Sequence, residues 1–264
     1  MTTADGADLA VTIAGPADGP TVVLAHCWMG SRAIWGPVAD RLVQSGHRVV
    51  LYDQRGHGAS TSGERSLSVQ VLGDDLRAVL ESVDVRDAVL VGHSMGGMTV
   101  QSYVNEHPVD FDERARAIVL VSTAAKVAGR SNAARQTRSG AHRNAPRWMS
   151  QGLLGYSTSR VAFGRAPRRC DVELTAHGVA VTPAAIRDGY MTAMATMDLR
   201  QALGTVHVPA TVLVGSRDLL TPPRLARVLA DGIPGARLVV LPRIGHMLPL
   251  EAPDAVVDAI TRTA

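Results

Sequence analysis

The sequence predicts an α/β fold with a mostly parallel, doubly wound, eight-stranded sheet and a helical insertion. Short apolar runs, typical of strands buried on both faces of a parallel sheet, alternate with helical segments over most of the chain. The alternation stops between about residues 124 and 207, where no long β run occurs. With 264 residues, 46% of them apolar, the chain can fill one sizeable core.

The strands are expected in the following order. A hairpin opens the chain, with a short strand at 2–4, a turn at Asp5-Gly6 and an alternating strand at 8–13. Six apolar runs follow, at residues 21–25, 49–52, 88–91, 118–121, 211–214 and 238–241. We therefore divide the chain into a core, residues 1–123 and 208–264, and a helical insertion, residues 124–207.

Helices are predicted between most of these strands, and several begin with the Pro, Ser or Asp that helix starts favour. Their ranges are about 33–45, 68–82, 95–107, 222–231 and 253–262. Inside the insertion, Thr182 as N-cap and Pro183 at the first position predict a helix that runs to Met197. We expect the insertion to lie over the carboxyl end of the sheet, where open α/β sheets bind ligands.

Several classes of protein are disfavoured by composition. Residues 1–6 lack the features of a signal peptide, and no apolar run approaches the roughly 18 residues of a membrane span, so a soluble, cytoplasmic protein is expected. Cys27 and Cys170 are the only cysteines, which argues against a disulfide framework or a structural zinc site. We expect no metal and no cofactor.

The charge is distributed unevenly. The net charge is +3, and no acidic residue occurs between Arg114 and Cys170, a stretch that carries many arginines. Two interpretations stay open: a solvated arginine-rich surface, or a surface that attracts an anionic substrate or acyl carrier. Aromatic residues make up only 3% of the chain and no nucleic-acid motif is present, so nucleic acid is not an expected partner. The oligomeric state is not indicated.

A serine between two glycines marks the candidate site. Gly92-His93-Ser94-Met95-Gly96 joins a predicted strand to a predicted helix, the context of a nucleophile elbow. A serine nucleophile requires a histidine base and usually a carboxylate that orients the histidine. Asp218 follows the penultimate apolar strand and His246 the last one, in the order Ser, acid, His. The predicted triad is therefore Ser94, Asp218 and His246.

Less specific interpretations exist for these residues. Asp218 precedes Thr221-Pro222-Pro223 and could serve only as a turn or capping residue, and His246 could be an ordinary loop histidine. His26 and His57 also lie near strand ends, but neither has a similarly placed acid, and His93 should point away from Ser94 across the turn. Attack by serine also creates an oxyanion that needs amide donors. We predict the backbone N–H groups of Met95 and of Trp28, in the loop after the central strand.

Together these motifs resemble the α/β-hydrolase superfamily, in particular its branch of small capped esterases, lactonases and cofactor-free haloperoxidases. The resemblance covers nearly the whole chain: residues 26–30 look like the His-Gly oxyanion loop, and residues 53–58 like the Asp-x-Arg-Gly-x-Gly turn. The resemblance implies a structural role for Asp53. Cys27 departs from the pattern, because it stands where glycine is usual; it either narrows the oxyanion hole or fills space.

The leading hypothesis is a serine hydrolase that cleaves a carboxylic ester through an acyl-enzyme. Lactonase, thioesterase, perhydrolase, and acyltransfer or cyclisation activities would use the same groups, and a non-catalytic ligand sensor is a hypothesis of another class. Epoxide and haloalkane hydrolysis are disfavoured, because those relatives carry an aspartate at the elbow. Methionines near the motifs and in the insertion form either ordinary core or an adaptable apolar pocket, with candidates at Met29, Met149, Met191, Met194 and Met247.

Overall fold

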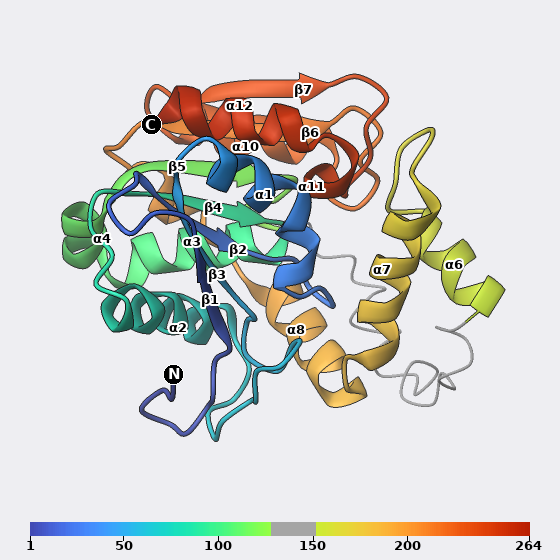
Figure 1. Cartoon of the computed structure of the whole chain (residues 1–264), viewed down its shortest axis with the longest axis horizontal. Coiled ribbons are helices and arrows are strands. Elements are labelled where there is room, and N and C mark those ends of the chain that lie inside the picture. Colours follow the sequence, from blue (N-terminus) through green and yellow to red (C-terminus); the bar gives the residue numbers. More distant parts are fainter. Residues whose placement is uncertain (128–151) are drawn as a thin grey trace.

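A sheet of seven strands lies at the centre of the computed structural model, which describes residues 1–127 and 152–264 (Figure 1). Its spatial order is β1-β3-β2-β4-β5-β6-β7. β1 pairs with β3 in antiparallel orientation, and every other pair is parallel. The strands are β1 (Val11–Ala14), β2 (Thr21–Ala25), β3 (Arg48–Tyr52), β4 (Ala88–His93), β5 (Ala115–Val121), β6 (Ala210–Gly215) and β7 (Arg237–Leu241). The doubly wound α/β prediction is confirmed.

The predicted count of eight strands is not met in the described residues, because the opening hairpin is limited to one antiparallel bridge. Thr2 and Asp8 make this bridge, and the first strand begins only at Val11. Around this bridge the Leu9 N–H donates to Met1 O at 2.7 Å and the Thr3 N–H to Ala7 O at 2.8 Å. The amide N–H groups of Asp8 and Ala10 donate to the hydroxyls of Thr61 and Ser60, at 2.8 and 2.9 Å. Side chains from the turn after β3 thus bind the edge of residues 8–10 that does not face residues 1–3.

Helices cover both faces of the sheet. α2, α3 and α10 pack on one face, together with α8 and α9, while α1, α11 and α12 pack on the other. The helices are η1 (Arg32–Trp35), α1 (Gly36–Gln44), α2 (Val69–Ser82), α3 (Met95–Glu106), α4 (Pro108–Arg114), α6 (Gly152–Arg160), α7 (Arg169–Val181), α8 (Ala184–Thr196), α9 (Arg200–Leu203), α10 (Pro223–Gly232), α11 (Leu248–Glu251) and α12 (Pro253–Thr263).

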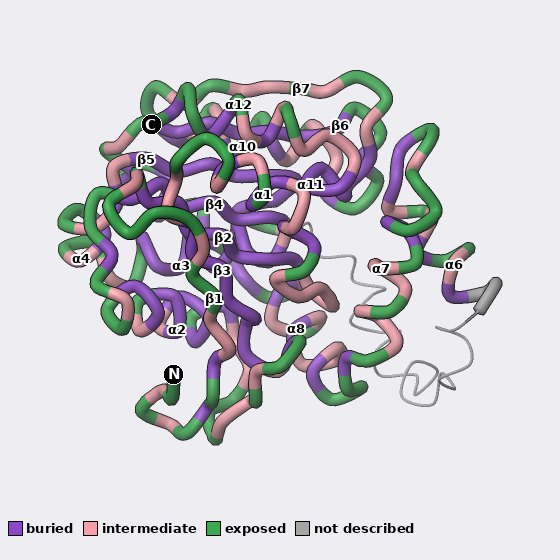
Figure 2. The backbone as a smooth tube through the Cα atoms, in the orientation of Figure 1, coloured by how far each residue is buried: buried purple, intermediate pink, exposed green. Residues whose placement is uncertain are grey.

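The central strands are buried on both faces. Figure 2 shows them as the buried centre of the molecule, and all five residues of β2 and all six of β4 are buried. Alternate side chains of β2 enter opposite core clusters, Val23 on the side of α2 and α3 and Val22 on the side of α1 and α12. Continuous apolar runs are the sequence pattern of such strands. None of the helices in the described ranges is long and apolar enough to cross a membrane.

Helices α6 to α9 lie between β5 and β6 in the chain, and in Figure 1 α6, α7 and α8 lie on the side toward which β7 points. The predicted N-cap at Thr182 is shifted by one residue. Pro183 is the N-cap of α8, and the Thr182 hydroxyl donates to Gly178 O at 2.7 Å, at the end of α7. Thr182 therefore completes the preceding helix, because its side chain finds a carbonyl acceptor there.

A buried charge cluster holds the turn after β3. The Arg55 side chain is 1% exposed, and its guanidinium donates to both oxygens of Asp75 in α2, at 2.8 and 2.6 Å. The same group contacts Asp5 in the N-terminal loop, and this hydrogen bonding holds the pKa of the Asp5 carboxyl below its usual range. Arg55 thus joins the N-terminal loop, the turn and α2.

Candidate active site

Ser94 lies at a sharp turn between β4 and α3. Its backbone has φ 54° and ψ −116°, a conformation that non-glycine residues rarely adopt and that the surrounding structure must hold in place. The Ser94 N–H donates to Val121 O at 2.9 Å, and the Thr123 hydroxyl donates to Ser94 O at 2.6 Å. A Cβ at Gly92 or Gly96 would run into neighbouring backbone, so the glycines of the motif allow the turn to pack.

Asp218 and His246 meet at the carboxyl ends of β6 and β7. His246 Nδ1 lies 2.9 Å from Asp218 Oδ2, and both side chains are at most 5% exposed. Asp218 Oδ1 also accepts the N–H groups of Leu220 and Thr221, and the Thr221 hydroxyl donates to Oδ2 at 2.8 Å. A carboxylate at Nδ1 favours the tautomer with its proton there, which leaves Nε2 free to accept one.

The pKa of Asp218 stays below its usual value despite burial. Burial alone would raise it, but the interaction with His246 and the hydrogen bonds from Thr221 favour the charged form and outweigh that effect. The carboxylate is therefore ionised at neutral pH. Sequence reasoning did not single out Thr221, although its position three residues after Asp218 in a turn was a usable signal.

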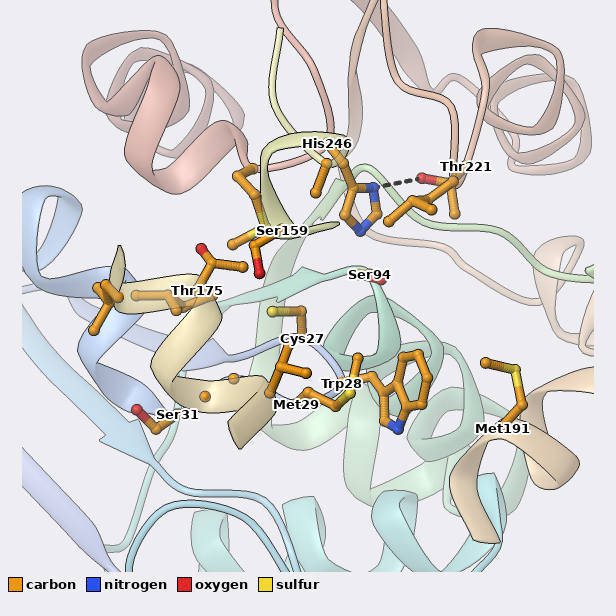
Figure 3. A pocket seen from close by; sticks show the side chains of 18 of the residues that line it. Cys27, Trp28, Met29, Ser31, Ser94, Ser159, Thr175, Met191, Thr221 and His246 are labelled. Atoms are coloured by element: carbon orange, nitrogen blue, oxygen red, sulfur yellow. Dashed lines mark hydrogen bonds between the residues drawn. The ribbon is translucent and has the colours of Figure 1, made fainter. Parts of the chain in front are cut away.

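Ser94 and His246 line one cavity of about 820 Å³. Figure 3 shows the ring nitrogen of His246 that does not face Thr221 on the side toward Ser94. Loops at the ends of β2 and β7 form one part of the lining, and α6, α7 and α8 form another. All three predicted triad residues thus lie at one edge of the sheet, and two of them face the cavity.

The loop after β2, residues 26–31, lies beside the nucleophile and includes Trp28 (Figure 3). Within the described ranges, no hydrogen bond is donated by the amide N–H of Trp28 or of Met95. His26 fixes this loop, because its Nε2 accepts Gln54 N–H at 2.8 Å and its Nδ1 then donates to Cys27 O at 2.7 Å. Burial lowers the pKa of His26 to about 3, so the ring stays neutral.

Gln54 braces the loop against α3, a role that sequence reasoning missed. Its side-chain amide donates to His26 O, and its Oε1 accepts the Thr99 hydroxyl at 2.6 Å. The two predicted oxyanion donors thus belong to segments joined through one glutamine. In the sequence, only the position of Gln54 in the turn at 53–58 indicated this role.

Cys27 is buried and contributes to the cavity wall. A Cβ at Gly30 would lie 2.8 Å from Cys27 Sγ, so the thiol occupies space beside the loop backbone. Burial raises the pKa of Cys27 to about 12, which keeps it a neutral thiol at physiological pH.

Asp53, His57 and His93, the other residues considered from the sequence, each bind backbone groups. Asp53 accepts the backbone N–H groups of Arg32 and Ala59, at 2.7 and 2.9 Å. His57 Nδ1 pairs with Arg55 O, and His93 Nε2 donates to His246 O at 2.8 Å. These three side chains stabilise loops and do not line the cavity.

Methionines are prominent in the cavity wall. Of the five predicted pocket residues, Met29, Met191, Met194 and Met247 line it, and Met149 lies outside the described residues. Met98 also lines the cavity and was not among those candidates. Its place on the first turn of α3, four residues after Ser94, was the signal that could have identified it.

Comparison with known proteins finds a matching family model and similar enzymes. The family model described as serine aminopeptidase, S33, matches residues 18–253. The bifunctional esterase/perhydrolase of Acinetobacter calcoaceticus is 39% identical over 110 residues, which are 42% of this chain and 40% of that protein. The 3-oxoadipate enol-lactonase 2 of Acinetobacter baylyi is 28% identical over 257 residues, covering 93% and 89% of the two chains.

The fold is shared with solved structures. An esterase from Exiguobacterium antarcticum matches with a TM-score of 0.87 at 20% identity, covering 99% of this chain and 98% of that one. The family match spans most of the sequence, and the resemblance predicted from the motifs is confirmed. The chain therefore belongs to this family within the α/β-hydrolase superfamily, and it is an α/β-hydrolase enzyme.

Proposed function

We propose that the chain is a serine hydrolase of carboxylic esters in which Ser94, His246 and Asp218 are the catalytic triad. The observation that carries the proposal is the 2.9 Å hydrogen bond between His246 Nδ1 and an ionised Asp218, beside a strained turn that carries Ser94. A strained backbone at a cavity with an oriented base is typical of a nucleophile site.

The proposed reaction has two halves. His246 Nε2 takes the Ser94 hydroxyl proton as the oxygen attacks the ester carbonyl, and then gives that proton to the leaving alcohol as the acyl-enzyme forms. In the second half, a water molecule gives a proton to Nε2 and attacks the acyl group, and the acid leaves as Ser94 regains its proton. Asp218 stabilises the imidazolium formed in each half.

The oxyanion of each tetrahedral intermediate requires N–H donors. We assign the amides of Trp28 and Met95, which flank Ser94 from the loop after β2 and from the start of α3. Each such donor contributes on the order of 10²- to 10³-fold in rate. In this proposal the brace from Gln54 to His26 keeps the first donor in place.

The cavity favours a neutral, apolar acyl or alcohol group. No Lys, Arg, Asp or Glu occurs among the described residues that line it, whereas methionine, valine and leucine side chains are frequent. Several cations of the arginine-rich stretch pair with carboxylates instead, as Lys126 does with Asp198 and Arg168 with Asp171. We propose that residues 124–207 form a cap that shapes this pocket, and that the substrate group bound against the described lining residues is uncharged.

A series of p-nitrophenyl esters of increasing acyl length tests the proposal. We expect turnover that Ser94→Ala removes, together with a lower KM for longer uncharged acyl groups than for a matched ester that ends in a carboxylate. Turnover that survives in Ser94→Ala contradicts the triad. Multiple turnovers also exclude a ligand sensor, which would bind without releasing product.

Perhydrolysis is a second candidate, favoured by the 39% identity to an esterase/perhydrolase over 110 residues. In this reaction hydrogen peroxide replaces water and the acyl-enzyme yields a peracid. Peracid formation from a short ester in the presence of peroxide, measured against Ser94→Ala, tests it. Peracid formed equally by both proteins contradicts this candidate.

A further inference from the structure

One carboxylate joins the loop that carries His246 to the connection between α6 and α7. Glu251, the last residue of α11, accepts Gly164 N–H on Oε2 at 2.6 Å. It accepts Gly245 N–H on both oxygens, at 3.1 and 3.2 Å, and Met247 N–H on Oε1 at 3.2 Å. The carboxylate thus holds the residues before and after His246 and, with the same two oxygens, a residue of the α6–α7 connection.

The two segments also contact each other directly. His246 N–H donates to Ala162 O at 2.7 Å, and Arg165 N–H donates to Arg243 O at 3.2 Å. A Cβ at Gly164 or at Gly245 would run into backbone of the other segment, so glycine permits this close approach. In Figure 1 the α6–α7 connection rises beside the loop that follows β7.

The connection is held from its other side by a cation. Arg160 donates to Phe163 O at 3.2 Å and to Arg165 O at 3.0 Å, so its guanidinium binds the carbonyls of the segment whose N–H group binds Glu251. Burial raises the pKa of Glu251, while the three N–H groups and the charge of Arg160 favour the ionised form. A carboxylate suits this place because it accepts on both oxygens, whereas a glutamine would turn an NH₂ group toward at least one N–H.

The same connection forms part of the cavity wall. Val161 and Ala162 line the cavity together with His246 and Met247. The hydrogen bonds of Glu251 therefore set the place of the histidine relative to one wall of the pocket. His93 adds a further contact to the same loop, because its Nε2 donates to His246 O.

We propose that Glu251 is a positioning residue that fixes His246 and residues 162–165 as one unit, and so aligns the base with the bound substrate. This inference rests on the proposed function. Glu251 does not line the cavity and touches no reacting atom; it acts through the backbone on both sides of the histidine.

Glu251→Gln tests the inference, with Asp254→Asn as the matched control. Asp254 lies three residues further on, and its ion pair with Arg41 is exposed. In Glu251→Gln we expect kcat for a p-nitrophenyl ester, per active site titrated with a phosphonate, to fall roughly 10- to 100-fold, because misplacement of a catalytic group by about 1 Å has effects of this size. KM should change much less, and Asp254→Asn should match the parent.

Hydrogen exchange gives a readout that does not depend on activity. The amides of Gly164, Gly245 and Met247 should exchange faster in Glu251→Gln than in the parent or in Asp254→Asn. Glu251→Asp keeps the charge on a shorter side chain and should recover part of the lost kcat; it also serves as the test if Glu251→Gln does not fold.

The outcomes separate this inference from the proposed function. If Ser94→Ala abolishes turnover while Glu251→Gln keeps the parental kcat and exchange rates, the positioning role is wrong and the triad stands. If turnover survives in Ser94→Ala, the proposed function itself fails. Equal loss of kcat in Glu251→Gln and Asp254→Asn also overturns the inference, since it indicates a general charge effect.

Discussion

At the scale of single residues, the site depends on a buried carboxylate whose two oxygens are both hydrogen-bonded. Asp218 combines a hydrogen bond to His246 with three from Leu220 and Thr221, and this network keeps its pKa low although the side chain is almost inaccessible. The cost of burying the charge is thereby offset. A carboxylate at this place both orients the imidazole and stabilises its protonated form.

Asp218→Asn should therefore impair catalysis more than binding. An asparagine can donate its NH₂ to His246 Nδ1, which moves the ring proton to Nε2 and leaves no acceptor for the Ser94 proton. We expect kcat to fall by about 10⁴-fold, the size of effect known for a wrong histidine tautomer, with little change in KM. Steady-state kinetics measure this; a loss below tenfold would mean that Asp218 does not set the tautomer.

The residues that sequence reasoning identified and those it missed differ in how they act. Ser94, Asp218 and His246 follow predicted strands, and the topology of a parallel sheet brings such positions to one edge. Gln54, Thr221 and Glu251 act through hydrogen bonds to backbone groups of other loops. No spacing pattern encodes these contacts, because they depend on how the loops fold over one another.

At the scale of elements, strongly periodic segments were predictable to within a few residues. The helix expected at 68–82 spans Val69–Ser82, and the one expected at 253–262 spans Pro253–Thr263. The opening hairpin was predictable only in part: residues 1–3 pair with residues 7–9 across the turn, but through a single bridge, and the first strand begins at Val11. The N–H groups of residues 8 and 10 donate to side chains of residues 61 and 60, which no local signal indicated. Tertiary contacts thus add to the local pairing of this segment and do not replace it.

The ion pairs of Arg55 with Asp5 and Asp75 connect separate elements, and we expect them to contribute to stability. Arg55→Met should lower the free energy of unfolding by about 3–5 kcal/mol, because it leaves Asp75 buried without its partner. Arg65→Met is the matched control: its pair with Asp74 is solvent-exposed and should matter by less than about 1 kcal/mol. Urea titrations of the three proteins measure both effects, and equal losses would contradict the role given to Arg55.

At the scale of the whole molecule, burial of neutral histidines couples stability to pH. Burial lowers the pKa of His26 and of His93 from 6.5 to about 3 in each case. Below about pH 6.5 the unfolded chain takes up protons at these residues and the folded chain does not. Their contribution to stability is therefore complete above that pH and is lost as the pH falls toward 3.

The free energy of unfolding should accordingly decrease between about pH 6 and pH 4.5, by up to about 1.4 kcal/mol per pH unit for each of the two histidines. Urea titrations across this range measure the slope. His93→Gln should reduce the slope, and the exposed His207→Gln serves as the control. A slope that is the same with and without His93 would show that this residue is not buried in its neutral form.

The site of covalent labelling shows whether Ser94 is the nucleophile activated by His246. The parent and Ser94→Ala would each be treated with a fluorophosphonate, and the intact masses and the labelled peptide would be determined. We predict one adduct per parent chain, located on Ser94, and none on Ser94→Ala. An adduct on another residue, or an unlabelled parent that still turns over esters, would contradict this role of Ser94.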